Sequence, residues 1–107
     1  MLYKSTRGLI EKVSFQEVLF SGLAPDGGLY IPEFLPEPET FNVNSFRSKE
    51  YDEIAQSVLK PFIGNFFDDD QLSEITNKAY SKFRSKNRCE LVKLSNDHMM
   101  LELFHGP

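Results

Sequence analysis

The run Ser5-Thr6-Arg7-Gly8 is the part of the sequence best suited to hold an anion. Its two hydroxyls and its guanidinium can donate hydrogen bonds to a phosphate, and the glycine lets the backbone approach closely. The run lacks the spacing of a phosphate-binding loop, so it does not define a site by itself. The alternative is a strand end followed by a turn glycine. We therefore treat Ser5, Thr6 and Arg7 as candidate substrate-binding residues.

A second run, Asp26-Gly27-Gly28, places a carboxylate next to two glycines. Glycines allow the backbone to approach a ligand, but a tight turn also needs them. The sequence leaves both interpretations open.

Side chains that commonly bind metals or act as nucleophiles are few. The acidic residues 68–70 lack the ligand spacing of a calcium loop, and a helix cap with first-turn charges explains them better. His98 and His105 have no histidine or cysteine three or four positions away, and Cys89 has no identifiable base. His105 ends an apolar strand, where a functional and a structural role both stay open. We expect no metal site and no complete catalytic set in this chain.

Residues 78–93 contain six basic residues and one acidic residue. Such a stretch can bind an acidic partner, or it can be the solvated end of a helix. No nucleic-acid motif accompanies it, and the whole chain carries a net charge of −4. We therefore expect no nucleic-acid partner.

The composition indicates one soluble globular domain. The 107 residues are 40% hydrophobic and 26% charged, which suits a single modest core. No run approaches the ~18 apolar residues of a membrane span, so we expect no membrane partner. A single cysteine fits a reducing compartment, and we expect a cytoplasmic protein.

Short elements flank the two candidate runs. Ser14 and Glu17 have the spacing of a capping box, which predicts a short helix through Phe20. Runs rich in apolar residues and bounded by turn residues predict short strands. These strands are expected at 2–6, 29–31, 90–95 and 99–104, the last two as a hairpin.

Two longer helices follow from apolar residues that repeat at helical spacing. The first is predicted over 51–59, with Ser48 as its N-cap and Pro61 ending it near Lys60.

The second longer helix is predicted over 72–83, with Asp68 or Asp69 as its cap. Two longer helices, one short helix and several short strands in mixed order favour an α+β fold.

These runs, in this order, resemble the N-terminal region of threonine synthase, a family of enzymes that use pyridoxal 5′-phosphate (PLP). The resemblance covers nearly the whole chain and is weaker at 36–48 and 66–88. The matching runs are 3–8, 14–19, 22–32, 51–55, 61–64 and 101–107.

The resemblance implies a reaction for the full-length protein, which is the conversion of O-phospho-L-homoserine and water to L-threonine and phosphate on PLP. In the family, the closing run continues into a segment whose lysine forms the Schiff base with the cofactor. That lysine is expected just after Pro107. The resemblance thus implies no catalytic residue in this chain, no cofactor bound to it alone, and no activity of its own.

The resemblance also implies a division of the protein. Residues 1–107 would form the N-terminal domain, with about 91–107 leading into the catalytic domain as its partner. Ser5, Thr6 and Arg7 would help to bind the phosphorylated amino acid. Two alternatives stay open: a related PLP-dependent phospho-lyase, and a stand-alone interaction domain that binds through residues 78–93.

Overall fold

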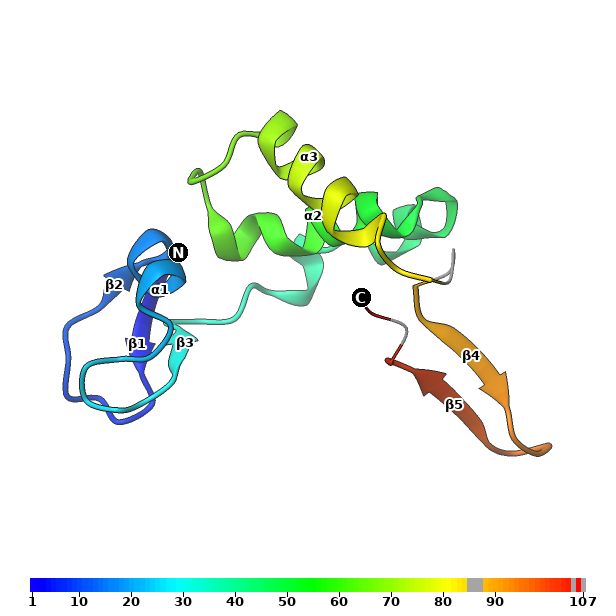
Figure 1. Cartoon of the computed structure of the whole chain (residues 1–107), viewed down its shortest axis with the longest axis horizontal. Coiled ribbons are helices and arrows are strands. Elements are labelled where there is room, and N and C mark those ends of the chain that lie inside the picture. The colour runs from blue at the N-terminus through cyan, green and yellow to red at the C-terminus, as the bar shows by residue number, and fades with distance from the viewer. Residues whose placement is uncertain (85–87, 105, 107) are drawn as a thin grey trace.

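The fold mixes helices and short strands, as a computed structural model of residues 1–84, 88–104 and 106 shows (Figure 1). The elements in chain order are β1 (Leu2–Ser5), β2 (Val13–Ser14), α1 (Phe15–Ser21), β3 (Tyr30–Pro32), the 3-10 helices η1 (Pro38–Thr40) and η2 (Val43–Ser48), α2 (Tyr51–Ile63), α3 (Asp69–Tyr80), β4 (Glu90–Lys93) and β5 (Met99–Glu102). The α+β prediction is confirmed.

The N-terminal unit is a three-stranded antiparallel sheet in the order β2-β1-β3. In the central strand β1, Tyr3 and Ser5 are buried, whereas their neighbours point to solvent. Helix α1 begins where the capping box predicts, because Ser14 Oγ accepts a hydrogen bond from Glu17 N at 3.3 Å and Glu17 accepts one from Ser14 N at 2.8 Å.

The second unit is an antiparallel pair of helices, α2 and α3, packed along their length (Figure 1). Leu72 and Thr76 of α3 are each 3% exposed. Gln56 of α2 reaches across the pair, and its Nε2 donates to Thr76 Oγ1 at 3.0 Å. A buried apolar side chain and a satisfied polar pair therefore lie at the same helix contact.

Both predicted ends of α2 need correction. The N-cap is Glu50 rather than Ser48, because Ser48 closes the 3-10 helix η2. Pro61 lies inside the last turn, and the helix ends at Ile63. Proline has a helix-compatible φ and costs one backbone hydrogen bond, which a final turn tolerates better than a helix centre.

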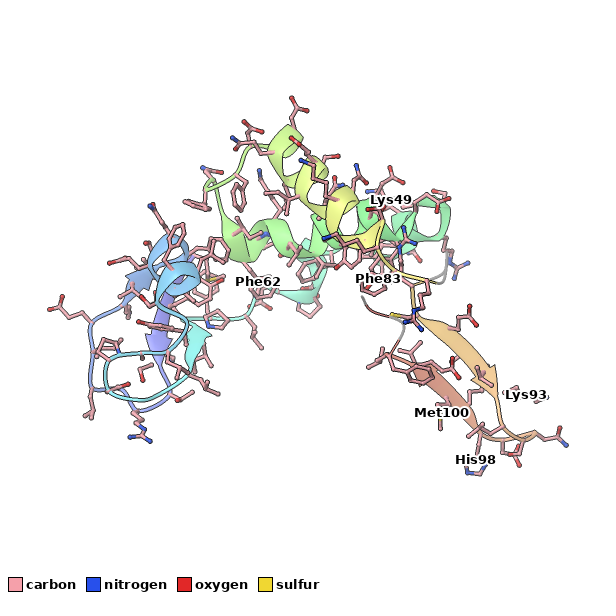
Figure 2. All side chains as sticks on the ribbon, viewed as in Figure 1. Lys49, Phe62, Phe83, Lys93, His98 and Met100 are labelled. Atoms are coloured by element: carbon pink, nitrogen blue, oxygen red, sulfur yellow. The ribbon has the colours of Figure 1, made fainter. Side chains whose placement is uncertain are left out.

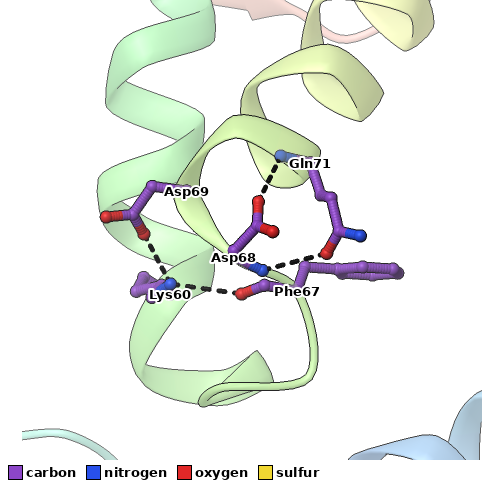
Figure 3. A network of polar contacts seen from close by, with 5 residues as sticks. All are labelled: Lys60, Phe67, Asp68, Asp69 and Gln71. Carbon is purple, nitrogen blue, oxygen red and sulfur yellow. Dashed lines mark hydrogen bonds and ion pairs between the residues drawn. The ribbon is translucent and has the colours of Figure 1, made fainter.

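Asp68 is the N-cap of α3, within a small network that joins this helix to α2 (Figure 3). Asp68 Oδ1 accepts from Gln71 N at 2.8 Å, and Gln71 Oε1 accepts from Asp68 N at 3.1 Å. Lys60 Nζ donates to the Phe67 carbonyl at 3.2 Å and to Asp69 at 2.5 Å. Asp68 thus serves as the helix cap and Asp69 as the ion-pair partner of Lys60, so neither needs a metal ion to explain its position.

Aromatic side chains join the sheet to the helical pair. Tyr3 donates its hydroxyl hydrogen bond to the Phe62 carbonyl at 2.9 Å. The rings of Phe15 and Phe66 lie edge to face, with centroids 5.7 Å apart. Phe62 lies at this junction in Figure 2.

The hairpin of β4 and β5 projects away from both units, with Lys93, His98 and Met100 near its far end (Figure 2). The predicted hairpin is confirmed, although each strand ends earlier than predicted. Leu91 pairs with Leu101, and both are more than half exposed.

The chain as a whole is open rather than closely packed. Its radius of gyration is 16.7 Å, compared with about 13 Å for a compact domain of this length. Among the described residues, the buried hydrophobic ones are Tyr3, Ala24, Ile63 and Leu72. No helix in the described ranges is long and apolar enough to cross a membrane.

Candidate functional site

The fold brings together the two runs that the sequence singled out, 5–8 and 26–28. Strands β1 and β3 are antiparallel, with Ser5 opposite Tyr30, so the turn before β3 folds over the end of β1. Thr6 N donates to the Leu29 carbonyl at 2.8 Å and extends this pairing by one bond.

Asp26 is the centre of the resulting cluster. Its Oδ1 accepts hydrogen bonds from Ser5 Oγ at 2.7 Å and from Gly28 N at 2.9 Å. Its Oδ2 accepts one from Leu9 N at 3.2 Å. Both carboxylate oxygens are therefore engaged by donors from three different parts of the chain.

These donors keep Asp26 ionised. Desolvation acts to raise the pKa of Asp26, but the hydrogen bonds from Ser5, Gly28 and Leu9, together with the charge of Arg7, lower it further than desolvation raises it. The net result is a pKa below the ordinary value for aspartate.

Ser5 and Thr6 hold the loop. Ser5 is 4% exposed, and its hydroxyl donates to Asp26 while it accepts from Arg7 N at 3.1 Å. Thr6 Oγ1 accepts from Leu29 N at 3.0 Å. Ser5 therefore uses its hydroxyl as both donor and acceptor within the protein, whereas the exposed Thr6 hydroxyl accepts one bond and keeps its O–H as a donor.

Arg7 is exposed and carries the cluster's positive charge. Its Nη1 donates to the Asp26 carbonyl oxygen at 3.1 Å. A guanidinium has five N–H donors, so it can keep this bond and still bind an anion through others. Arg7 is the member of the candidate trio best placed to meet a ligand.

The two glycines are needed because side chains converge on them. A β-carbon on Gly28 would lie 2.1 Å from Ser5 Oγ, a separation that no real contact shows. Gly27 has φ +76°, and a β-carbon there would lie 3.4 Å from Arg7 Nη1. The turn requires glycine at position 27 and the close approach of the Ser5 side chain requires it at position 28, whereas the approach of a ligand to this backbone stays a prediction.

Sequence analysis missed Asp26 as the central residue. Its bond to Gly28 follows the common pattern of an aspartate that caps a backbone N–H two residues ahead, so part of its role was readable from the turn. Its bond to Ser5 spans 21 positions and depends on the pairing of β1 with β3.

The other candidate residues lie elsewhere. Cys89 is half-buried beside Tyr51, and desolvation together with a hydrogen bond to Cys89 raises the pKa of Tyr51 to about 12. His98 is exposed in the hairpin turn, with Nδ1 3.1 Å from Ser95 Oγ. His105 falls outside the described residues.

No group of three or more potential metal ligands occurs among the residues that the structure describes. The expectation that the chain binds no metal stays a prediction.

The basic stretch 78–93 is partly neutralised by nearby acids. Lys78 pairs with Glu74 at 2.6 Å, and Arg88 lies 3.8 Å from Asp52. Lys86, another member of the stretch, falls outside the described residues. These pairs leave less unbalanced charge for an acidic partner than the sequence count indicates.

Comparisons with known proteins converge on one family. The family model described as "Threonine synthase N terminus" matches residues 2–80. The chain is 39% identical to "Threonine synthase-like 2" of Mus musculus over 99% of its own length and 22% of that protein. It is 38% identical to "Threonine synthase" of Pseudomonas aeruginosa, covering 100% of the chain and 23% of that protein.

Solved structures give the same result. PLP-bound threonine synthase from Brucella melitensis superposes with a TM-score of 0.91 at 39% identity, over 100% of the chain and 23% of that structure. Yeast threonine synthase superposes with a TM-score of 0.79 at 32% identity, over 98% of the chain and 22% of that structure. The chain thus spans less than a quarter of the length of these relatives. Since the family model covers most of the chain, the chain belongs to the threonine synthase N-terminus family.

Proposed function

We propose that this chain is the N-terminal part of a PLP-dependent enzyme that converts O-phospho-L-homoserine and water to L-threonine and phosphate. The observation that carries the proposal is its likeness, along the whole chain, to a PLP-bound threonine synthase. In such an enzyme the cofactor supplies an electron sink for carbanions formed from the substrate.

Two of the described lysines line pockets, and each is paired with a carboxylate. Lys60 lines a pocket together with Asp69, to which it donates a hydrogen bond. Lys78 lines another pocket with Glu74, its ion-pair partner. Both lysines are thus already engaged within this chain.

We therefore place the cofactor and its lysine in the remainder of the longer protein. In this proposal residues 1–107 form the leading domain, about 91–107 connect it to the catalytic domain, and the chain alone is inactive. The single cysteine is compatible with the cytoplasm, where we place the protein.

Within this enzyme, we assign Arg7 to the phosphate group of the substrate. The exposed guanidinium has several charged donors to spare, whereas Ser5 donates its hydroxyl hydrogen to Asp26 and Thr6, whose Oγ1 accepts from Leu29 N, offers a single neutral donor. Ser5 and Thr6 then support the site by holding the loop that carries Arg7.

The test is steady-state kinetics of the full-length protein with O-phospho-L-homoserine. Loss of a charge-assisted hydrogen bond to phosphate should raise the substrate KM of Arg7→Ala by about tenfold or more. Lys4→Ala is the matched control, because Lys4 is also exposed and cationic but lies on strand β1 outside the cluster. Unchanged kinetics of Arg7→Ala would remove Arg7 from the substrate site.

A second candidate function is that of a related PLP-dependent phospho-lyase. The observation that favours it is a relative of nearly equal identity that carries a different name, "Threonine synthase-like 2". Phosphate release from another phosphorylated amino alcohol, with no L-threonine formed from O-phospho-L-homoserine, would select this alternative.

A further inference from the structure

We propose that Asp26 is the positioning residue for Arg7, and that it sets the direction in which the guanidinium meets the substrate phosphate. This inference rests on the proposed function, because it assumes that Arg7 contacts substrate. In this proposal Asp26 does not bind the substrate itself and acts only through Arg7.

Asp26 holds Arg7 at both ends. The Asp26 carbonyl accepts from Nη1 at the tip of the side chain, at 3.1 Å. The Asp26 carboxylate accepts from Ser5 Oγ, and the same oxygen of Ser5 accepts from the Arg7 backbone N at 3.1 Å. One residue therefore fixes the tip of Arg7 directly and its backbone through Ser5.

The segment on the far side of Arg7 is held in the same way. Leu9 N donates to Asp26 Oδ2 at 3.2 Å, and Gly8 N donates to the Ser5 carbonyl at 3.0 Å. Leu9 is 78% exposed, so packing of its side chain does not hold this segment in place. The orientation of the loop thus depends on hydrogen bonds, and those donated by Ser5 Oγ, Arg7 Nη1 and Leu9 N all end on Asp26.

The arrangement leaves most N–H donors of Arg7 available. The guanidinium bonds to the uncharged carbonyl of Asp26, whereas the carboxylate oxygens are taken by Ser5, Gly28 and Leu9. A cation oriented by a neutral acceptor can still bind a phosphate through its other donors. Small displacements of such a group are costly, because catalysis depends on placement to about 1 Å.

The experiment is a double-mutant cycle on kcat/KM in the full-length protein. The variants are Asp26→Asn, Arg7→Ala and the double variant, with O-phospho-L-homoserine as substrate. Asp26→Asn keeps the shape but loses the charge and one acceptor oxygen, so KM should rise by roughly three- to tenfold with a smaller change in kcat. In the Arg7→Ala background the same substitution should change kcat/KM by less than about twofold.

Two companion variants separate positioning from general destabilisation. Ser5→Ala cuts the relay to the Arg7 backbone but leaves Asp26 in place, so it should raise KM and also lose its effect once Arg7 is alanine. Ser14→Ala removes the cap of α1, away from the cluster, and should lower thermal stability without raising KM.

The outcomes are distinct. The positioning role would be overturned if the effects of Asp26→Asn and Arg7→Ala on kcat/KM multiply in the double variant, or if Asp26→Asn has normal kinetics. Either result would leave the proposed reaction intact. A wild-type protein that forms no L-threonine would instead refute the proposed function. If Asp26→Asn fails to fold, Ser5→Ala measured with and without Arg7→Ala tests the positioning role instead. Effects on kcat/KM that multiply would again overturn it.

Discussion

At the scale of single residues, the N-terminal cluster depends on an aspartate that the chemistry of its neighbours keeps charged. Asp26 accepts three hydrogen bonds, and its pKa lies below the ordinary value. The sequence indicated that the residues around Asp26 could form hydrogen bonds. It could not predict that they lie close together, because this depends on the register in which β1 and β3 pair.

The lowered pKa of Asp26 predicts a pH dependence of stability. A carboxyl whose pKa is lower in the folded chain than in the unfolded one contributes stability above the unfolded value of about 4. That contribution is lost as pH falls through the lower, folded value. Denaturant titrations from pH 7 to pH 2 should therefore show a shallower loss for Asp26→Asn than for wild type.

Glu17 and Glu74 also have lowered pKa values, so the Asp26→Asn curve should keep part of its slope. Parallel curves for the two proteins would mean that Asp26 titrates alike in both states, contrary to the geometry.

Gly28 should tolerate no side chain. Its β-carbon would overlap Ser5 Oγ, so Gly28→Ala is expected to cost about 1–3 kcal/mol of unfolding free energy, as overpacking does. Gly22→Ala is the comparison, because open space surrounds Gly22 and its φ of +71° alone opposes a side chain. The kinetic consequence separates them: Gly28→Ala should raise the substrate KM, and Gly22→Ala should not.

At the scale of elements, local signals predicted that the three α-helices exist, but they placed several helix ends wrongly and missed the smallest elements. The capping box predicted for Ser14 and Glu17 is confirmed, and of the two caps predicted for α3 the structure shows Asp68. Strand β2 was missed because two residues become a strand only by pairing with β1. Helix α2 runs past Pro61 to Ile63 because the fixed φ of proline is compatible with a helix, although its missing N–H costs one backbone hydrogen bond.

The cap of α3 gives a prediction at this scale. Asp68→Ala removes the side chain that accepts from Gln71 N and should lower the unfolding free energy by about 1 kcal/mol. Asp70→Ala is the matched control, since Asp70 lies in the first turn but is not the N-cap. Equal effects in chemical denaturation would show that charge near the helix end matters more than the cap.

At the scale of the whole molecule, the open shape fits a domain that belongs to something larger. The hairpin of β4 and β5 exposes Leu91, Met99 and Leu101, and it has no third strand in the described part of the chain. A two-stranded hairpin is at best marginally stable in water. If the chain is the leading domain of a longer enzyme, as proposed, contacts with the rest of that enzyme should stabilise the hairpin.

Hydrogen exchange should reveal this dependence. In the isolated chain, amides of β4 and β5 should exchange faster than those of α2 and α3, whose contact buries Leu72 and Thr76. In the full-length protein, the hairpin amides should become protected. Equal protection of the hairpin in both proteins would show that it is stable by itself.

The most direct test of the central claim is a titration of PLP into the 107-residue chain and into the full-length protein. We expect a saturable, stoichiometric Schiff-base absorbance from the full-length protein, and none from the chain. A stoichiometric, lysine-specific signal from the 107 residues alone would contradict the account of this segment as the cofactor-free leading domain of a PLP enzyme.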